Sequence, residues 1–208
     1  MTSKLIIVVL LLALLIVCGK LYMGASGRQA PANDVTDAFT TILTRSSVRA
    51  YTAQPVEQDK IEKLLRAGMA APSACDKRPW HFVVVTDKQL LKGLAEANPN
   101  ASYADSAPLA IVVYGDMSKT LQGVEQQFWI QDCSAASENI LLAAHAMGLG
   151  AVWTGTYPVA ERCQAVARVL NLPSHLVPLN TIVIGYPSGK AHAKDKWDAA
   201  NVTYNKFK

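Results

Sequence analysis

The chain has 208 residues, half of them hydrophobic, and carries a formal net charge of +4 at pH 7. This length fits one domain with a sizeable core behind a separate N-terminal segment. So small and scattered a positive charge argues against nucleic-acid binding, although it suits an anionic cofactor or substrate. Beyond Cys18, the three remaining cysteines show no close pairing and no metal-ligand spacing. This excludes a disulfide-stapled scaffold and predicts no metal site.

Residues 1–23 predict a segment that targets the chain to a membrane. Lys4 leads an unbroken apolar run over residues 5–17, followed by Cys18. A run of this length is typical of a signal-peptide core and is short for a membrane span. Residues 15–18 resemble a bacterial lipoprotein box, but Val17 stands where that box has a small residue. A cleaved signal peptide, a leader lipid-modified at Cys18 and a retained anchor all stay open. Each directs the chain to a membrane of the bacterial cell envelope and leaves the domain outside the cytoplasm.

Residues 24–33 are small and polar with Gly and Pro and predict a linker, after which one domain fills residues 34–208. Apolar periodicity predicts helices over about 34–44, with Asp34 as N-cap, and over about 55–70, 87–94, 125–147 and 159–170. Short apolar runs predict buried strands over 81–85, 109–114, 151–153 and 181–185. The 125–147 helix is apolar on more than one side, so it is either the central helix of the domain or a subunit interface. The tail from Tyr186 has no core pattern and is expected to order only by packing on something else.

The stretch Arg45-Ser46-Ser47-Val48-Arg49 follows the first helix. In an extended backbone, Arg45, Ser47 and Arg49 point to one side, and Ser46 and Val48 point to the other. Two guanidinium groups and a hydroxyl that converge on one space suit a phosphate monoester. The alternative is a pair of solvated arginines beside a helix end.

Other stretches offer polar groups to a ligand. The connection over residues 71–80 carries the Ser73 hydroxyl, the Asp76 carboxylate and exposed amides, which can hydrogen-bond the edge of a planar heteroaromatic ring; it can equally be a plain helix-to-strand connection. Gly155 permits close approach of a ligand to the backbone of 153–155. Lys194 and Lys196 can add cations to a phosphate site. Asp132, among apolar neighbours on the long helix, points either into a cavity or to solvent.

The order of these motifs resembles the FMN-dependent nitroreductase family over residues 34–196. The sequence runs from Arg-Ser-Ser-Val-Arg to Ala-Pro-Ser, Pro-Trp-x-Phe, Trp-x-x-Asp and Gly-x-Gly-x-x-Trp-x-Gly, and ends with Ile-x-x-Gly-Tyr-Pro and a lysine pair. Alternating helices and strands alone would suggest a doubly wound parallel sheet. The resemblance instead implies an α+β fold with a central mixed, largely antiparallel sheet flanked by helices, a long central helix, and a homodimer with two FMN sites at its interface.

The resemblance also assigns roles to individual residues. The FMN phosphate and ribityl chain would be held by Arg45, Ser46, Ser47, Arg49, Lys194 and Lys196. The isoalloxazine ring would face Trp153, Thr154 and Gly155 on one side, and Ser73 and Asp76, contributed by the partner subunit, on the other. Asn98 matches a further flavin contact. No side chain is assigned as catalytic, because the flavin carries the chemistry.

The implied activity is transfer of hydride from NAD(P)H through FMN to a nitroaromatic, quinone or similar acceptor by a ping-pong mechanism. Because nicotinamide nucleotides are cytoplasmic, two alternatives stay open: a membrane-tethered flavoprotein with a non-nicotinamide donor, and a non-catalytic flavin-binding protein. The chain departs from the family at Asp76 and Arg78, where asparagine and glutamine are usual. A carboxylate beside the reduced flavin predicts a lowered reduction potential or a shifted choice of substrate, with Arg78 as its salt-bridge partner.

Overall fold

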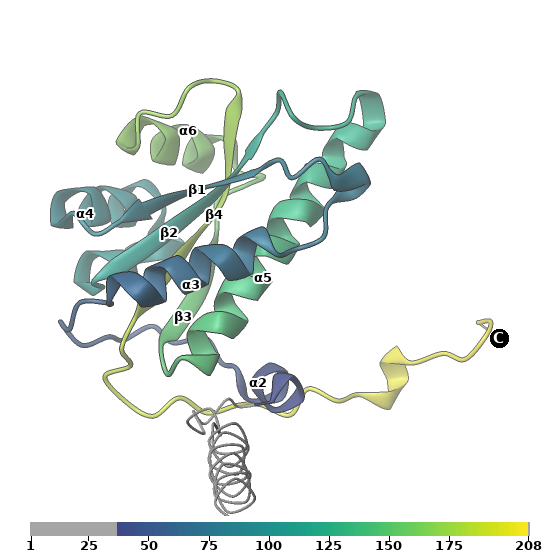
Figure 1. Cartoon of the computed structure of the whole chain (residues 1–208), viewed down its shortest axis with the longest axis horizontal. Helices are drawn as coiled ribbons and strands as arrows, with labels where there is room; N and C mark the ends of the chain where they lie inside the picture. Colours follow the sequence, from purple (N-terminus) through teal and green to yellow (C-terminus); the bar gives the residue numbers. More distant parts are fainter. Residues whose placement is uncertain (1–36, 208) are drawn as a thin grey trace, which may run out of the picture. The chain divides into compact units, whose positions relative to one another are not determined.

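The computed structural model describes residues 37–207, which form one α+β domain (Figure 1). The predicted targeting segment over 1–23, the predicted linker over 24–33 and Asp34, the predicted N-cap, lie outside the described residues. Within residues 37–207, every helix is too short or too polar to cross a membrane.

The helices occur where apolar periodicity predicts them, with two corrections at their starts. The first helix is capped by Asp37 rather than by Asp34, because the Asp37 carboxylate accepts the amides of Phe39 and Thr40 at 3.0 Å. The long helix begins at Phe128, since the residues before it form a 3₁₀ turn. The α-helices are α2 (Ala38–Thr44), α3 (Gln58–Met69), α4 (Lys88–Ala97), α5 (Phe128–Ala146) and α6 (Ala160–Val169), and the 3₁₀ turns are η1 (Ala74–Asp76), η2 (Pro99–Ser106), η3 (Gly123–Gln127) and η4 (Ala199–Asn201).

The described strands are β1 (Trp80–Val85), β2 (Leu109–Asp116), β3 (Gly150–Gly155) and β4 (Leu176–Gly185), in the sheet order β1-β2-β4-β3. All three pairings are antiparallel. The parallel component within residues 37–207 is an isolated bridge between Ser47 and Ala151. These pairings confirm the largely antiparallel sheet and exclude the doubly wound alternative.

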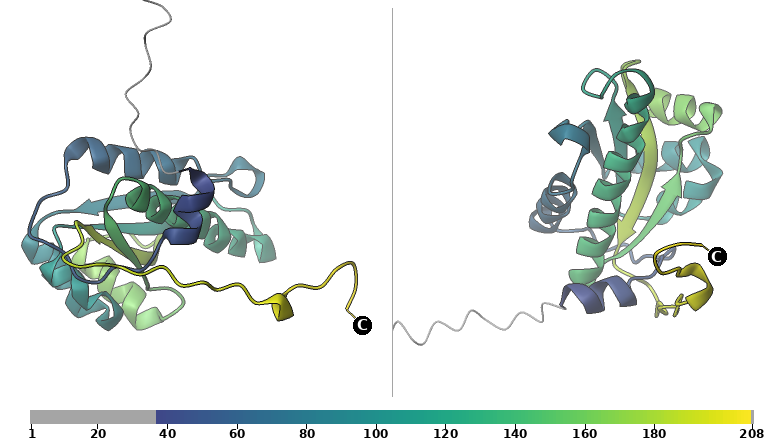
Figure 2. Two further views of the ribbon diagram at one scale, coloured as in Figure 1. Left: turned by 90° about the horizontal axis from the view of Figure 1, so that it is seen from below. Right: turned by 90° about the vertical axis from the view of Figure 1, so that its right-hand side faces the viewer.

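Two layers of helices enclose the sheet. Figures 1 and 2 show α3 and α5 on one face and α4 and α6 on the other. Ile140 and Ala144 of α5 are fully buried on the first face, and Val166 of α6 is fully buried on the second. The apolar pattern of α5 on more than one side is explained by this arrangement, because the helix packs against both the sheet and α3.

The chain that leaves α2 is fixed to the outer edge of β3, and the start of the tail is fixed to that chain. The Val48 amide donates to the Ala151 carbonyl at 3.0 Å. Gly150 allows this approach, because an added Cβ there would lie 2.6 Å from Val48 Cγ1. Two further backbone bonds join Thr52 to Tyr186, at 2.8 Å, and Ser188 to Ala50, at 3.1 Å. Residues far apart in sequence are thereby brought to one end of the sheet.

Candidate functional site

A cavity of about 240 Å³ lies where the tail passes the chain that leaves α2. The structure thus brings together the six residues assigned to the phosphate, since the lining consists of Arg45, Ser46, Ser47, Arg49, His192, Lys194 and Lys196. Ser46 lines the cavity as well, although simple strand alternation placed it on the opposite side. Two guanidinium groups, two hydroxyls, two ammonium groups and an imidazole form a donor set that fits a phosphate monoester.

Contacts with α5 and η2 hold the two arginines. Arg45 is the C-cap residue of α2, and its Nε lies 3.3 Å from Glu138 Oε1 of α5. The Arg49 guanidinium lies 5.9 Å from the ring centroid of Tyr103 in η2, a cation–π contact. Arg45 thus keeps one carboxylate partner, while Arg49 has no ion-pair partner among residues 37–207. The cavity is therefore positively charged overall.

His145 of α5 supports the end of α2 beside this cavity. Its Nε2 lies 2.8 Å from the Thr44 hydroxyl, which donates its proton to the Thr40 carbonyl at 2.7 Å. The ring nitrogen therefore acts as the donor to Thr44. Burial lowers the pKa of His145, and the nearby Arg45 guanidinium lowers it further. A neutral imidazole thus joins α2 to α5 without placing another charge next to the arginines.

His192 was missed by sequence reasoning. The tail has no periodicity that would indicate which of its residues point inward, and one histidine in a polar stretch is not a signal. Its place follows from the bond between Ser188 and Ala50, a pairing that local patterns do not reveal.

The end of β3 presents backbone rather than side chains. Apart from its two chain neighbours, no residue in 37–207 lies within 4 Å of the position that a Cβ on Gly155 would occupy. Asn98 is fully buried, and its amide donates to the Gly155 carbonyl at 2.9 Å. The Thr154 hydroxyl donates to the Thr181 carbonyl at 2.6 Å inside the sheet. Gly155 is thus open to a ligand, whereas Asn98 positions the strand end and Thr154 has only its backbone to offer.

Trp153 lies on the same side of β3 as Ala151, and it is partly buried against the core cluster that α5 shares. Because β3 is at the edge of the sheet, the backbone of Trp153 has β4 as its strand partner on one side only. Trp153 therefore combines a core contact with an unpaired backbone edge.

The connection between α3 and β1 is folded tightly around Ser73. The Ser73 hydroxyl accepts the Arg78 amide at 2.9 Å, and the Arg78 guanidinium makes two 2.6 Å bonds to the Asp76 carboxylate. The predicted salt bridge between these two departures from the family pattern is thus present. Its hydrogen bonds lower the pKa of Asp76. The carboxylate is ionised and largely neutralised by its partner.

Asp132 anchors this connection to α5. It is buried, and its Oδ1 accepts the Ala74 amide at 2.8 Å. Burial raises the pKa of Asp132, while the bond from Ala74 opposes the shift. Of the two alternatives drawn from the sequence, exposure to solvent was wrong. Asp132 instead fixes the backbone of the connection that carries Ser73 and Asp76, through its bond to the Ala74 amide.

One chain does not bring Ser73 and Asp76 to its own phosphate cavity. Asp132, which holds their connection, lies near the start of α5, whereas His145 meets α2 near its end. The two residues are thirteen positions apart, which corresponds to about 20 Å along the helix. These two groups of predicted site residues therefore lie at opposite ends of α5.

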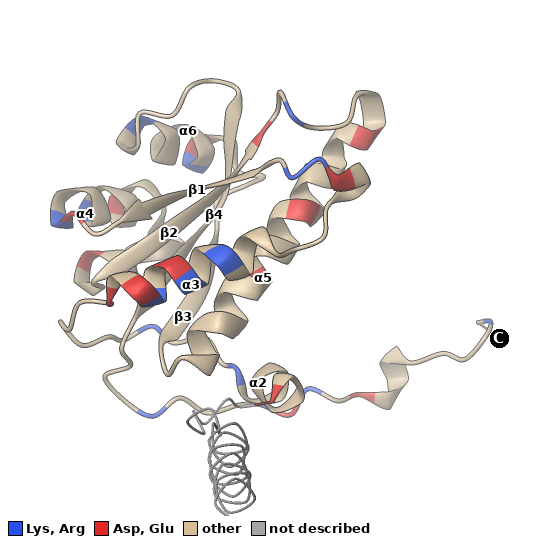
Figure 3. Cartoon of the chain, viewed as in Figure 1, with Lys and Arg blue, Asp and Glu red and all other residues tan. Residues whose placement is uncertain are grey.

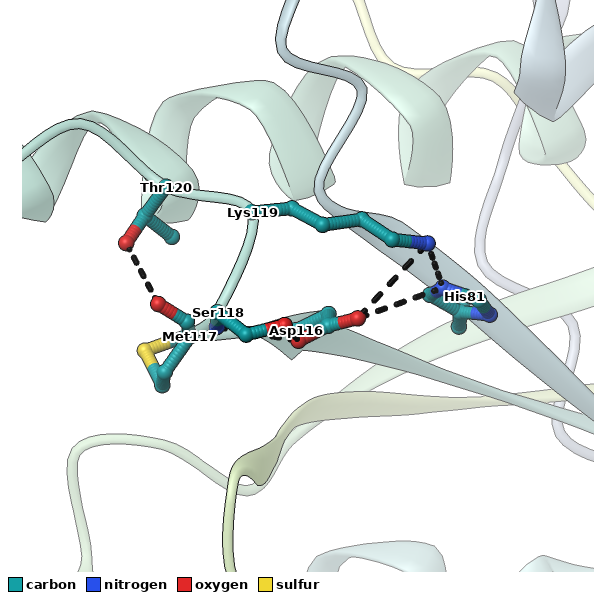
Figure 4. A network of polar contacts seen from close by, with 6 residues as sticks. All are labelled: His81, Asp116, Met117, Ser118, Lys119 and Thr120. Carbon is teal, nitrogen blue, oxygen red and sulfur yellow. Dashed lines mark hydrogen bonds and ion pairs between the residues drawn. The ribbon is translucent and has the colours of Figure 1, made fainter.

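A second polar network lies at the other end of the sheet from Gly150, as the register of β2 with β4 shows. The Lys119 ammonium lies 2.7 Å from His81 Nε2 and 3.6 Å from Asp116 Oδ2 (Figure 4). Burial and the Lys119 charge lower the pKa of His81, so the neutral ring accepts from Lys119. Asp116 also accepts the amide and hydroxyl of Ser118. None of the predicted site residues belongs to this network. We therefore assign it a structural role, which is to hold the turn that follows β2.

Comparison with known proteins agrees with this geometry. The model of the nitroreductase family matches residues 42–102 and 96–186. The chain belongs to the nitroreductase family.

Relatives and solved structures support the family assignment over most of the domain. A Methanothermobacter thermautotrophicus protein, provisionally named NADH dehydrogenase/NAD(P)H nitroreductase, is 42% identical over 172 residues, which cover 82% of this chain and 88% of that protein. A crystal structure from Parabacteroides distasonis with the same provisional name has a TM-score of 0.78 and 48% identity, covering 82% of this chain and 98% of that one. An FMN-dependent nitroreductase from Clostridium difficile has a TM-score of 0.74 and 31% identity, covering 80% of this chain and 98% of that one.

Proposed function

We propose that this nitroreductase-family protein is an FMN-dependent NAD(P)H oxidoreductase. The observation that carries the proposal is the cavity in which two arginines, two serines and two tail lysines meet. Its donor set matches a phosphate monoester, and the names of the relatives include NAD(P)H nitroreductase and FMN-dependent nitroreductase. When bound, FMN supplies the hydride chemistry, so that NAD(P)H and a nitroaromatic, quinone or similar acceptor react in turn by a ping-pong scheme.

The residues of the chain bind and orient the cofactor. Arg45, Arg49 and the two tail lysines would hold the phosphate, and Ser46 and Ser47 would donate hydroxyls to it or to the ribityl chain. The open backbone at Gly155, held in place by Asn98, would lie against the ring. In this scheme no side chain is required to move a proton.

The site would be completed in a homodimer. Within one chain the connection that carries Ser73 and Asp76 lies at the opposite end of α5 from the phosphate cavity. A second copy could supply this connection, and α5 offers a surface for it, since Phe128 is 39% exposed at its start. Asp76 would then bring its carboxylate, already paired with Arg78, towards the flavin.

An anaerobic redox experiment tests the activity. We expect the purified protein to be yellow, to bleach with NADPH or NADH without oxygen, and to recover its absorbance when a nitroaromatic is added. A yellow protein that bleaches with a quinol but with neither nicotinamide would favour the tethered flavoprotein with another donor. A yellow protein that is reduced by neither would favour a flavin-binding protein without turnover, and a colourless protein that takes up no FMN would refute all three.

We also propose that residues 1–23 attach the domain to the membrane of a bacterial cell envelope, with the domain outside the cytoplasm. Support comes from the apolar run after Lys4 and from Cys18. Protease added to spheroplasts should digest the domain if it is extracytoplasmic, while a cytoplasmic control protein stays intact. Full protection of the domain would contradict the proposal.

A further inference from the structure

The tail over residues 189–207 meets the domain through charged side chains that line a shared cavity. After the bond from Ser188 to Ala50, no hydrogen bond or ion pair joins this tail to the rest of residues 37–207. Its remaining bonds are local, as when Asp195 accepts the Trp197 amide at 2.9 Å. Figures 1 and 2 show the tail passing α2 and then running away from the sheet and helices. Ordinary core packing therefore does not account for its position beside α2.

Like charges meet where the tail passes the domain. Lys194 and Lys196 line the same cavity as Arg45 and Arg49, and Figure 3 shows basic segments both on the chain leaving α2 and on the tail beside it. Glu138 pairs with Arg45 alone. Four positive charges around one cavity repel each other unless an anion lies between them.

A neighbouring apolar contact depends on the same placement. Trp197, which is 75% exposed, lines a second cavity of about 570 Å³ together with Ile42 and Leu43 of α2. Asp195, between the two lysines, also lines this second cavity. So open a contact contributes little burial, and it does not offset the repulsion among the four cations.

We propose that a phosphate monoester is the clasp that fastens the tail to α2, so that binding of the phosphate and docking of the tail are one coupled event. The inference rests on the proposed function, because FMN is the expected source of the phosphate. The anion replaces repulsion among the four cations by charge-assisted bonds to both sides of the cavity. By linkage, the tail strengthens phosphate binding by the same factor by which phosphate strengthens docking of the tail.

Amide hydrogen exchange of the full chain in detergent micelles, after removal of any bound flavin, tests the clasp. FMN should slow exchange in the peptide that contains residues 190–197 by about tenfold or more. Riboflavin, which lacks the phosphate, should leave this exchange unchanged, and inorganic phosphate at millimolar concentration should slow it in part. Equal slowing by riboflavin and FMN, or a tail protected to the same degree without any anion, would overturn the proposal.

A pair of double variants separates the clasp from general charge effects. Lys194→Gln with Lys196→Gln should abolish the slowing by FMN and weaken FMN binding, measured from flavin absorbance after dialysis. Lys190→Gln with Lys206→Gln removes two charges from the same tail outside the cavity, and it should change neither. Slowing that persists in the first variant would refute the clasp.

The inference and the proposed function can fail separately. If the chain binds FMN and the tail still exchanges freely, the clasp is wrong and the flavin function stands. If FMN does not bind at all, the flavin function is wrong. The measurement with inorganic phosphate then tests the clasp. Slower exchange in residues 190–197 would support it, and unchanged exchange would refute it.

Discussion

Gly150 begins β3 directly beneath the chain that carries Arg45 and Arg49, and a side chain has no room there. An added Cβ would lie 2.6 Å from Val48 Cγ1 and 2.7 Å from Val48 Cβ. Because Cβ is fixed by the backbone, no rotamer of Val48 relieves the second contact. Gly150→Ala should therefore push residues 47–49 outward and displace Arg49 and Ser47 from the phosphate cavity.

The expected loss of stability follows from two opposing effects. Overpacking of this kind costs about 1–3 kcal/mol, while replacing glycine by alanine within a strand returns about 0.5–1 kcal/mol. The midpoints of these ranges give a net loss of about 1 kcal/mol, which corresponds to a fall in Tm of about 2–4 °C for a domain of this size. The displaced cavity residues should also lower the amount of flavin that copurifies.

Thermal unfolding and flavin content of the purified variant check both effects. Gly189→Ala is the matched control, because the added Cβ would have no atom of the described domain within 4 Å beyond its own chain neighbours. It should leave Tm and flavin content unchanged. If Gly150→Ala matches wild type in both measurements, β3 does not support the phosphate-binding chain as described.

Three further predictions test individual contacts. Arg45→Ala and Arg49→Ala should each weaken FMN binding in equilibrium dialysis by about 1.5–3 kcal/mol through loss of a charge-assisted contact; a double variant that purifies with full flavin would show the phosphate assignment to be wrong. Asp132→Ala leaves the partly buried Ala74 amide without its acceptor and should lower the free energy of unfolding in urea at pH 7 by about 1–3 kcal/mol. Asp132→Asn keeps an acceptor for this amide. The raised pKa of Asp132 means that its ionisation lowers the free energy of unfolding as the pH rises above about 4, so the asparagine variant should be at least as stable as wild type at pH 7. Equal losses of stability in both variants would contradict the role of the bond. Spectroelectrochemistry should show a higher flavin midpoint potential in Asp76→Asn and a lower one in Arg78→Gln, because the first removes a negative charge and the second unmasks it; identical potentials would exclude any effect of this pair on the flavin.

Features set by local pattern could be predicted from the sequence. Most helices and strands lie where periodicity placed them, and the arginine-serine stretch and tail lysines do line one cavity. The two-sided apolar pattern of α5 correctly required cover on more than one side.

Features set by tertiary packing could not be predicted in this way. His192 reaches the cavity because the chain around Ala50 pairs with Ser188. The bond from the buried Asn98 amide to the Gly155 carbonyl joins residues 57 positions apart, which no local pattern indicates. For Asp132 a signal existed, a carboxylate among apolar neighbours, but its partner Ala74 lies 58 residues away in sequence.

The central claim is that this chain binds FMN through the cavity between the chain leaving α2 and the tail. The most direct measurement is the identity and amount of the flavin released by denaturing the purified protein after it has been saturated with a mixture of FMN, FAD and riboflavin and then desalted. We predict FMN as the dominant flavin, at a ratio approaching one per chain, because the cavity fits a terminal phosphate. Release of riboflavin in equal amount, or of no flavin at all, would contradict the claim.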